Sequence, residues 1–331
     1  MVTGDERGMA AILANPKRFV TVPGMDTAAT HVLNFHWARW LGVGMSKRAL
    51  VWPHGHRVAV VCSVLLETWS DGKSPSYFPR TTPLPPGSKD IAGINWARFG
   101  GNEGIWRLSR NLRDLDIPAT LFCNGRSAEV WPDAVSAFAK SGQDIAGHGW
   151  LQDQTLFSLS AERERETIKK TLDTLEKIAG KRPTGWVTPI YGFSENTIDY
   201  LAEAKLTWCS DALDASVPYQ RQTKAGKIVM IPWSEFVDNR ALRASPRTYF
   251  DAYKDTFDYL HACEPGGLIN IGIHSHFGGR PLMAAAFRQL LEYMRSSRNV
   301  WFAHHRDVAK WIVEQKFEDT SYATRFPAAR P

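Results

Sequence analysis

The chain has 331 residues and a net charge of +6, and 44% of its residues are hydrophobic and 22% charged. This composition excludes a disordered polymer and indicates a soluble globular protein with a full core. The basic residues are dispersed, with no run of more than two Lys or Arg residues. A nucleic-acid-binding protein would concentrate them in a stripe, so no nucleic-acid partner is expected.

The four cysteines form no CxxC pair, and three of them lie in apolar runs. They are therefore expected to be buried thiols in a reducing compartment, and the spacing excludes a zinc finger. The first 30 residues contain no apolar stretch of the length of a signal peptide, and no segment approaches the ~18 consecutive apolar residues of a membrane span. A cytoplasmic protein without a membrane partner is expected.

Residues 1–56 show no clean hydrophobic period and are predicted to form an N-terminal extension. It is expected to pack on the following domain or on a neighbouring subunit, because it carries apolar side chains that need a surface to cover them. These side chains are Val32, Leu33, Phe35, Trp37, Trp40 and Leu41. A homo-oligomer, as a dimer or tetramer, is therefore expected.

A regular pattern begins at residue 57 with RVAVVCSVLL, which is typical of a strand buried on both faces. Residues 70–101 are rich in Pro, Gly and Ser and predict a long loop, which in a compact domain is usually functional. Strands and helices then alternate. Further strands are predicted at 118–124, 143–148, 184–189, 206–211, 227–233, 266–274 and 299–304, and helices at 103–115, 127–140, 160–179, 194–204, 247–263, 281–296 and 306–314.

Seven or eight consecutive βα units predict an α/β protein with a parallel sheet, and at this length a (β/α)7–8 barrel over residues 57–315, followed by a C-terminal tail at 316–331. The alternative is a doubly wound open sheet. That fold would place a glycine-rich phosphate turn after its first strand, where this chain has ETWSDG.

Functional groups of a parallel barrel collect at the carboxyl ends of its strands. Three such positions predict catalytic residues: Glu67, His148 and His274. A carboxylate directly after ten apolar residues has to be paired, metal-bound or catalytic. Other residues at or near strand ends are predicted to bind substrate, namely Trp69, Trp150, Tyr191, Asp211 and His276.

A catalytic zinc ion normally has three protein ligands. Glu67 and His148 would supply two, and Asp153 or His274 a third, but Gln152 occupies the position four residues after His148 where a second histidine would be expected. A divalent metal and metal-free catalysis both stay open. Without a metal, Glu67 or His148 would act as the general base on water, while His274 would polarise a carbonyl or protonate the leaving nitrogen.

The motifs SVLLETW, GHGW, GWVTP, IGIHSHFGGRP and NVWFAHHRDVAKW, in this order, resemble the polysaccharide deacetylase superfamily with its NodB homology domain. The resemblance covers about residues 50–315 and is nearest to the branch of allantoinase-like proteins and cyclic-imide hydrolases. It implies a distorted (β/α)7–8 barrel and hydrolysis of a C–N bond. Metal-dependent members carry an acidic motif on the first strand and an H-x3-H motif on a later one, and this chain departs at both positions.

Three functions are consistent with this sequence. The first is hydrolysis of a small cyclic amide, imide or ureide; the second is metal-dependent N-deacetylation of an acetylated sugar or of peptidoglycan. The third is a catalytically inactive barrel used for binding, since a fold alone does not determine activity.

Overall fold

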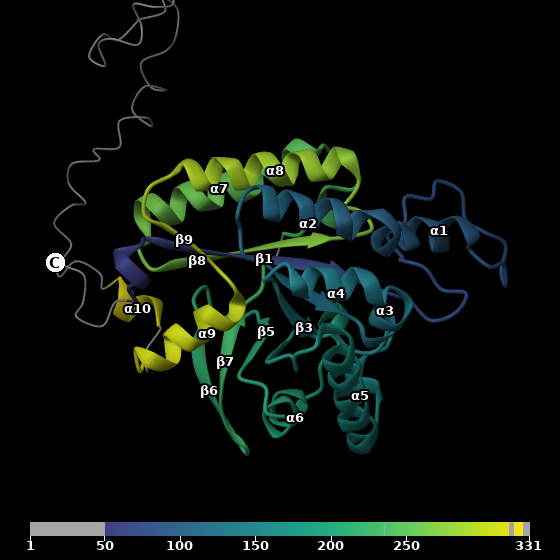
Figure 1. Cartoon of the computed structure of the whole chain (residues 1–331), viewed down its shortest axis with the longest axis horizontal. Coiled ribbons are helices and arrows are strands. Elements are labelled where there is room, and N and C mark those ends of the chain that lie inside the picture. Colours follow the sequence, from purple (N-terminus) through teal and green to yellow (C-terminus); the bar gives the residue numbers. More distant parts are fainter. Residues whose placement is uncertain (1–49, 235, 318–320, 327–331) are drawn as a thin grey trace, which may run out of the picture. The chain divides into compact units, whose positions relative to one another are not determined.

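A computed structural model of the chain describes residues 50–234, 236–317 and 321–326. A single sheet organises this part of the chain (Figure 1). Its strands are β1 (Val58–Leu66), β2 (Thr120–Cys123), β3 (Asp144–Gly147), β4 (Gly185–Trp186), β5 (Trp208–Ala212), β6 (Tyr219–Thr223), β7 (Gly226–Pro232), β8 (Gly267–His274) and β9 (Val300–Ala303).

The strand order is β6-β7-β5-β4-β3-β2-β1-β8, with β9 paired to β1. Every pairing is parallel except that of β6 with β7. The predicted α/β barrel is thus confirmed in its distorted form, a curled half-barrel. No pairing between β8 and β6 closes it within the described residues. The prediction that strands and helices simply alternate was wrong at β6, a hairpin strand in the segment between the strands predicted at 206–211 and 227–233.

The surroundings of β1 explain why its sequence is continuously apolar. Val60, Cys62 and Val64 belong to one hydrophobic cluster, with side chains from α2, α7 and α8, while Ala59 and Val61 belong to a second cluster inside the curl of the sheet. One edge of β1 pairs with β8 along its length; the other pairs first with β9 and then with β2. A strand enclosed in this way has no solvent-facing position for a polar side chain.

The helices cover the sheet. They are α1 (Ile91–Phe99), α2 (Ile105–Asp114), α3 (Gly125–Val130), α4 (Pro132–Lys140), α5 (Ala161–Ala179), α6 (Thr197–Glu203), α7 (Pro246–Cys263), α8 (Pro281–Ser296), α9 (His305–Glu314) and α10 (Tyr322–Arg325). Figure 1 shows α7 and α8 side by side, and α2 also packs against α8.

Two helices show how local sequence sets their limits. α5 begins after Ser160, whose side chain accepts a hydrogen bond from the Arg163 backbone N–H, and ends at Gly180 in the left-handed region, as predicted. The single helix predicted at 127–140 is instead two, because Pro132 starts a new helix at its first position. A five-residue π-helical turn, η3 (Gly100–Gly104), joins α1 to α2.

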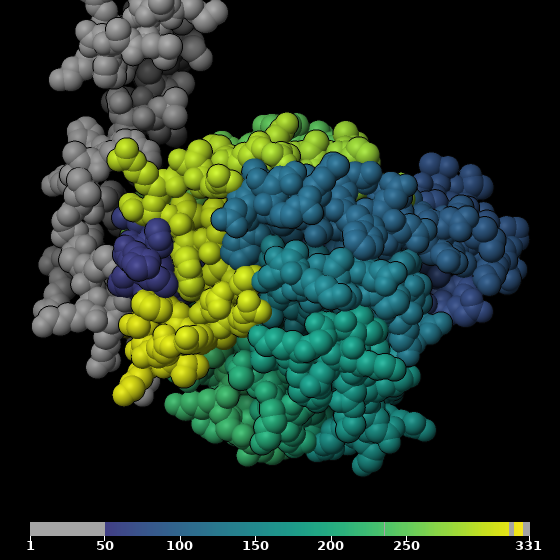
Figure 2. All heavy atoms as spheres, in the orientation of Figure 1, coloured from purple at the N-terminus to yellow at the C-terminus, as the bar shows by residue number. Residues whose placement is uncertain are grey.

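The end of the predicted N-terminal segment lies against the sheet. Trp52 is fully buried and its indole N–H donates to the Gly267 carbonyl at 2.8 Å. The Trp311 indole N–H donates to the Val51 carbonyl, and Figure 2 shows residues 50–56 beside the C-terminal residues. The apolar residues 32–41 that predicted a packing surface, with the rest of 1–49, lie outside the described residues, as do 318–320 and 327–331.

In the segments that the structure describes, no helix combines the length and the apolar character needed to span a bilayer.

Candidate active site

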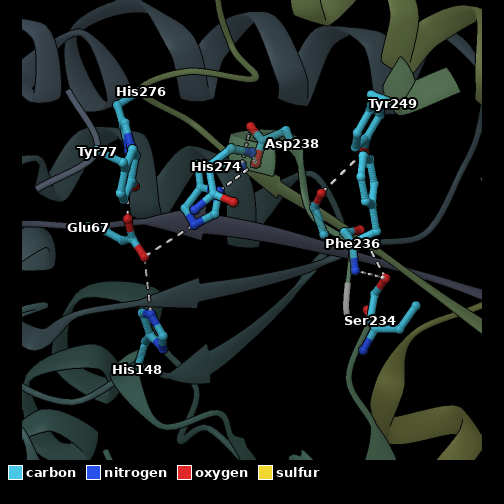
Figure 3. A network of polar contacts seen from close by, with 12 residues as sticks. Glu67, Tyr77, His148, Ser234, Phe236, Asp238, Tyr249, His274 and His276 are labelled. Atoms are coloured by element: carbon cyan, nitrogen blue, oxygen red, sulfur yellow. Dashed lines mark hydrogen bonds and ion pairs between the residues drawn. The ribbon is translucent and has the colours of Figure 1, made fainter. Parts of the chain in front are cut away.

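Glu67 stands at the centre of a cluster of buried histidines (Figure 3). Its Oε1 lies 3.3 Å from His148 Nε2 and 3.7 Å from His274 Nε2, and its Oε2 lies 3.7 Å from His276 Nδ1. The Glu67 side chain is not exposed to solvent. The structure therefore brings together the three predicted catalytic residues, which are far apart in the sequence.

The parallel sheet produces this convergence. Glu67 follows β1, His148 follows β3, and His274 is the last residue of β8. Asn124, after the intervening β2, ties two of these ends together: its Oδ1 accepts from the Thr68 N–H at 2.9 Å and its amide donates to the His148 carbonyl. Gly147 lets the strand approach its neighbour, since a Cβ there would lie 2.3 Å from the Trp186 ring.

The ring of His148 is held between a backbone carbonyl and Glu67. His148 Nδ1 lies 2.8 Å from the Val187 carbonyl, which can only accept, so Nδ1 carries a hydrogen. Its Nε2 faces Glu67 Oε1 at 3.3 Å. His148 thus links the backbone that follows β4 to the Glu67 carboxylate.

His274 lies between two carboxylates. Its Nδ1 contacts Asp238 Oδ1 at 2.5 Å, and its backbone N–H donates to Asp238 Oδ2 at 3.0 Å, while its Nε2 faces Glu67. Asp238 is fully buried in the short helical turn η6 (Asp238–Ala241) after β7. An imidazole held in this way is oriented and keeps its proton.

The charges of neighbouring groups outweigh burial at two of these positions. Burial by itself would raise the pKa of Glu67, but the charge of His274 and the hydrogen bond from His148 lower it to about 2. Burial would lower the pKa of His274, but Asp238 and Glu67 raise it to about 9. For His276, burial dominates over the attraction of Glu67 and lowers the pKa to about 3. At neutral pH Glu67 is therefore a carboxylate, His274 an imidazolium and His276 a neutral imidazole.

The long loop after β1 covers the cluster with aromatic side chains. Its Tyr77 hydroxyl contacts His276 Nε2 at 2.8 Å, and the rings of Trp69 and Trp96 pack against His276 at centroid distances of 5.3 and 5.0 Å. Asp153 anchors the start of the loop by accepting from the Ser70 N–H at 2.8 Å. The site is thereby small and shielded from bulk water, which strengthens its electrostatic interactions.

Three residues predicted to bind substrate are not brought to this cluster. Trp150 packs against Gly125 of α3, with the Lys170 ammonium 3.4 Å from its ring centroid. Tyr191 lies at the surface and is 41% exposed. Asp211 is buried, but its oxygens accept hydrogen bonds from the backbone and hydroxyl of Thr188 at 2.8 and 2.6 Å. Burial raises the pKa of Asp211.

The donor set does not fit the divalent metal that the resemblance implies. Within the described residues, no three His, Cys, Asp or Glu side chains are arranged to hold an ion. Glu67 directs both of its oxygens towards imidazoles, and Asp153, considered as a third ligand, holds Ser70 instead. Gln152 is buried at the position of the absent histidine, and an amide is a poor zinc ligand. No reaction step is therefore derived through a metal.

Sequence reasoning missed Tyr77, Trp96 and Asp238. The composition of the 70–101 segment marked it as functional, but it did not indicate which side chain enters the site. Asp238 was not predicted from its position because it comes six residues after the end of β7, and only residues at or near a strand end were considered. Its position close behind a strand end, next to a turn, was the available signal.

Comparisons with known proteins agree with this fold. A family model for polysaccharide deacetylase matches residues 97–209. A peptidoglycan deacetylase from Helicobacter pylori is 21% identical over 65% of this chain and 86% of its own length. A solved structure of a putative polysaccharide deacetylase from Mycobacterium smegmatis is 25% identical, with a TM-score of 0.71 over 87% of this chain and 99% of that one. The solved structure of Puue allantoinase is 24% identical, with a TM-score of 0.74 over 81% of this chain and 94% of that one.

Proposed function

We propose that this chain, which a family model for polysaccharide deacetylase matches over residues 97–209, hydrolyses a C–N bond, and that its substrate is a small cyclic amide, imide or ureide. The observation that carries the proposal is the buried Glu67 carboxylate, which lies within 3.7 Å of all three imidazoles. A base, an acid and a neutral donor around one point are what hydrolysis of an amide requires.

In the proposed reaction, Glu67 takes a proton from the attacking water, and His274 gives its proton to the leaving nitrogen. These two transfers are coupled. The charge of His274 is the main influence that lowers the pKa of Glu67, so Glu67 becomes a stronger base as His274 loses its proton. Asp238 acts as a positioning residue that keeps Nε2 of His274 directed at Glu67.

The burial of the reacting groups favours a small ligand over a polymer. His148, His274 and His276 are 2%, 6% and 1% exposed, and the rings of Tyr77 and Trp96 pack against His276. A sugar polymer would need an open groove across the strand ends, whereas a flat ring of a few atoms fits between aromatic side chains.

The second candidate is N-deacetylation of an acetylated sugar or of peptidoglycan. It is favoured by the Helicobacter pylori relative, which bears the name of a peptidoglycan deacetylase. The two candidates differ in product, since ring opening releases no acetate.

Purified protein should be assayed against hydantoins, cyclic imides and allantoin, and in parallel for acetate release from N-acetylglucosamine oligomers. We expect ring opening that falls by about 10²–10⁴ in kcat in the Glu67→Gln variant. Acetate release without ring opening would select the second candidate. A turnover that Glu67→Gln leaves unchanged would contradict the role of Glu67 in either reaction. No turnover of the wild type in either assay would favour an inactive binding module.

A homo-oligomeric assembly and a cytoplasmic location are proposed on the sequence alone. Sedimentation equilibrium of the full chain tests the first: a single species at the monomer mass would contradict it.

A further inference from the structure

We propose that His276 is a further catalytic residue, whose Nδ1–H polarises the scissile carbonyl, and that Tyr77 is the positioning residue that fixes this tautomer. The inference rests on the proposed hydrolysis at Glu67 and assigns a role that neither Glu67 nor His274 performs.

His276 is held rigidly at the base of the site. Its carbonyl accepts from Arg280 Nε at 3.1 Å, and the π-helical turn η3 packs against its backbone, where a Cβ on Gly100 would lie 3.0 Å from the His276 nitrogen. The rings of Tyr77 and His276 stack at 5.9 Å with an interplanar angle of 30°. A ring so constrained can present one nitrogen to a fixed point.

Two buried atoms face each other there without partners. Glu67 Oε2 and His276 Nδ1 are 3.7 Å apart, and neither has a hydrogen-bond partner among the described residues. That separation is too long for a direct hydrogen bond. Leaving such atoms unpaired costs free energy, which a bound ligand recovers when it supplies the complementary groups.

The tautomer follows from the hydrogen bond at the other nitrogen. His276 is neutral, since burial lowers its pKa to about 3, so the ring carries one proton. If that proton were on Nε2, the bare Nδ1 would face the carboxylate oxygen of Glu67 as a second acceptor. If Tyr77 donates to Nε2, the proton lies on Nδ1 and faces Glu67 favourably. Burial and the charge of Glu67 raise the pKa of Tyr77, so its hydroxyl stays protonated and able to donate.

The spacing of these two atoms suits the reaction. A water molecule poised for attack lies about 3–3.5 Å from the carbonyl carbon, so its oxygen and the carbonyl oxygen are separated by a similar distance. An acceptor and a donor 3.7 Å apart can therefore bind both oxygens through roughly parallel hydrogen bonds. Glu67 Oε2 would hold the water, and His276 Nδ1–H the carbonyl oxygen on which negative charge develops.

His274 cannot donate the hydrogen bond to the carbonyl oxygen. Its Nδ1 is bound to Asp238, and its Nε2 faces the other oxygen of Glu67. The two histidines at the end of β8 therefore have different roles in the proposed reaction. The cationic His274 supplies a proton, and the neutral His276 supplies a hydrogen bond.

Four variants test this division: His276→Leu, His276→Asn, Tyr77→Phe and, as a matched control, Tyr293→Phe, whose hydroxyl binds Asp258 on α7 at 2.7 Å. The amide nitrogen of asparagine stands where Nδ1 stands, so His276→Asn retains the donor. We expect His276→Leu to lower kcat by about 10²–10³ and His276→Asn to recover most of it. Tyr77→Phe should lower kcat about tenfold, as expected for one lost hydrogen bond, and Tyr293→Phe should leave it unchanged.

A second readout needs no substrate. In protein labelled with ¹⁵N-histidine, imidazole shifts identify the protonated nitrogen; we expect Nδ1–H for His276 in the wild type and a shift towards Nε2–H in Tyr77→Phe. A wild-type His276 protonated on Nε2 overturns the inference, as does a His276→Asn variant as slow as His276→Leu. If the wild type opens no ring in the panel, the proposed function fails, while the tautomer result still decides the assignment of Tyr77.

Discussion

Two regions of the sheet bury histidines among polar groups, and they shift the imidazole pKa in opposite directions. At the strand ends, His274 lies between Asp238 and Glu67, and its pKa rises to about 9. Deeper inside the curl, His305 at the start of α9 is fully buried, and its pKa falls to about 3 because burial is opposed by no carboxylate.

The interior network around His305 is made of neutral partners. The Ser63 hydroxyl donates to Asn270 Oδ1 at 2.6 Å, so His305 Nε2, at 3.2 Å, donates to the Ser63 oxygen. His305 Nδ1 then accepts from the Thr120 hydroxyl at 3.0 Å. Every hydrogen bond of the ring is satisfied in one tautomer. Burial alone therefore does not prepare an acid for catalysis; the carboxylates beside the ring do.

The largest effect is expected when His274 loses its carboxylate neighbour and so comes to resemble His305. Asp238→Asn removes the first charge that raises the pKa of His274, so that pKa should fall from about 9. A proton donor that is mostly neutral at pH 8 cannot protonate the leaving nitrogen, so kcat should fall by about 10²-fold or more. The alkaline limb of the pH–rate profile should move to lower pH.

Asp173→Asn is the matched control, because Asp173 forms ion pairs with Lys169 and Arg182 at the surface, away from the site. The pH profile of the control should coincide with that of the wild type. An alkaline limb that stays in place in Asp238→Asn would show that Asp238 does not set the protonation of His274.

The converse test removes the interior ring. His305→Leu leaves the Thr120 hydroxyl without its partner and should lower the free energy of unfolding by about 1–3 kcal/mol, measured by urea denaturation. Because no interaction links His305 to Glu67, kcat should stay within about twofold. His305→Gln, which keeps a donor towards Ser63, should cost less. A loss of kcat as large as that of Asp238→Asn would show that the two regions are one functional unit.

The sequence predicted the strand-end region better than the interior one. Parallel strands end at a common edge, so Glu67, His148 and His274 could be predicted to meet from their positions after apolar runs. The same rule selected Asp211, and the structure shows why that is insufficient: a strand end can direct its carboxylate into a neighbouring turn, here Thr188.

What could not be predicted depends on loop conformation and on which face a side chain takes. Tyr77 reaches His276 through a loop whose path is held by contacts far apart in the sequence, such as Asp153 with Ser70. His304 and His305 are adjacent at the start of α9, and the sequence does not show which of them enters the interior. The structure separates them: His304 contacts Asp307 at 3.0 Å, whereas His305 enters the interior. Sequence periodicity does not encode such a choice at a helix start.

The pH dependence of stability should differ in sign between the two regions. His305 and His276 have folded-state pKa values of about 3, below the unfolded value near 6.5. As the pH falls below 6.5, the unfolded chain binds protons that the folded chain does not, so stability decreases by up to about 1.4 kcal/mol per pH unit for each ring. His274 behaves oppositely: its contribution is complete below pH 6.5 and is lost as the pH rises through about 9. Urea denaturation of the wild type between pH 4 and 9 should show both limbs. In a plot of the free energy of unfolding against pH, His305→Gln should reduce the slope below pH 6.5 by the amount that corresponds to one proton and leave the slope near pH 9 unchanged. An unchanged slope below pH 6.5 would mean that the interior ring is not neutral in the folded protein.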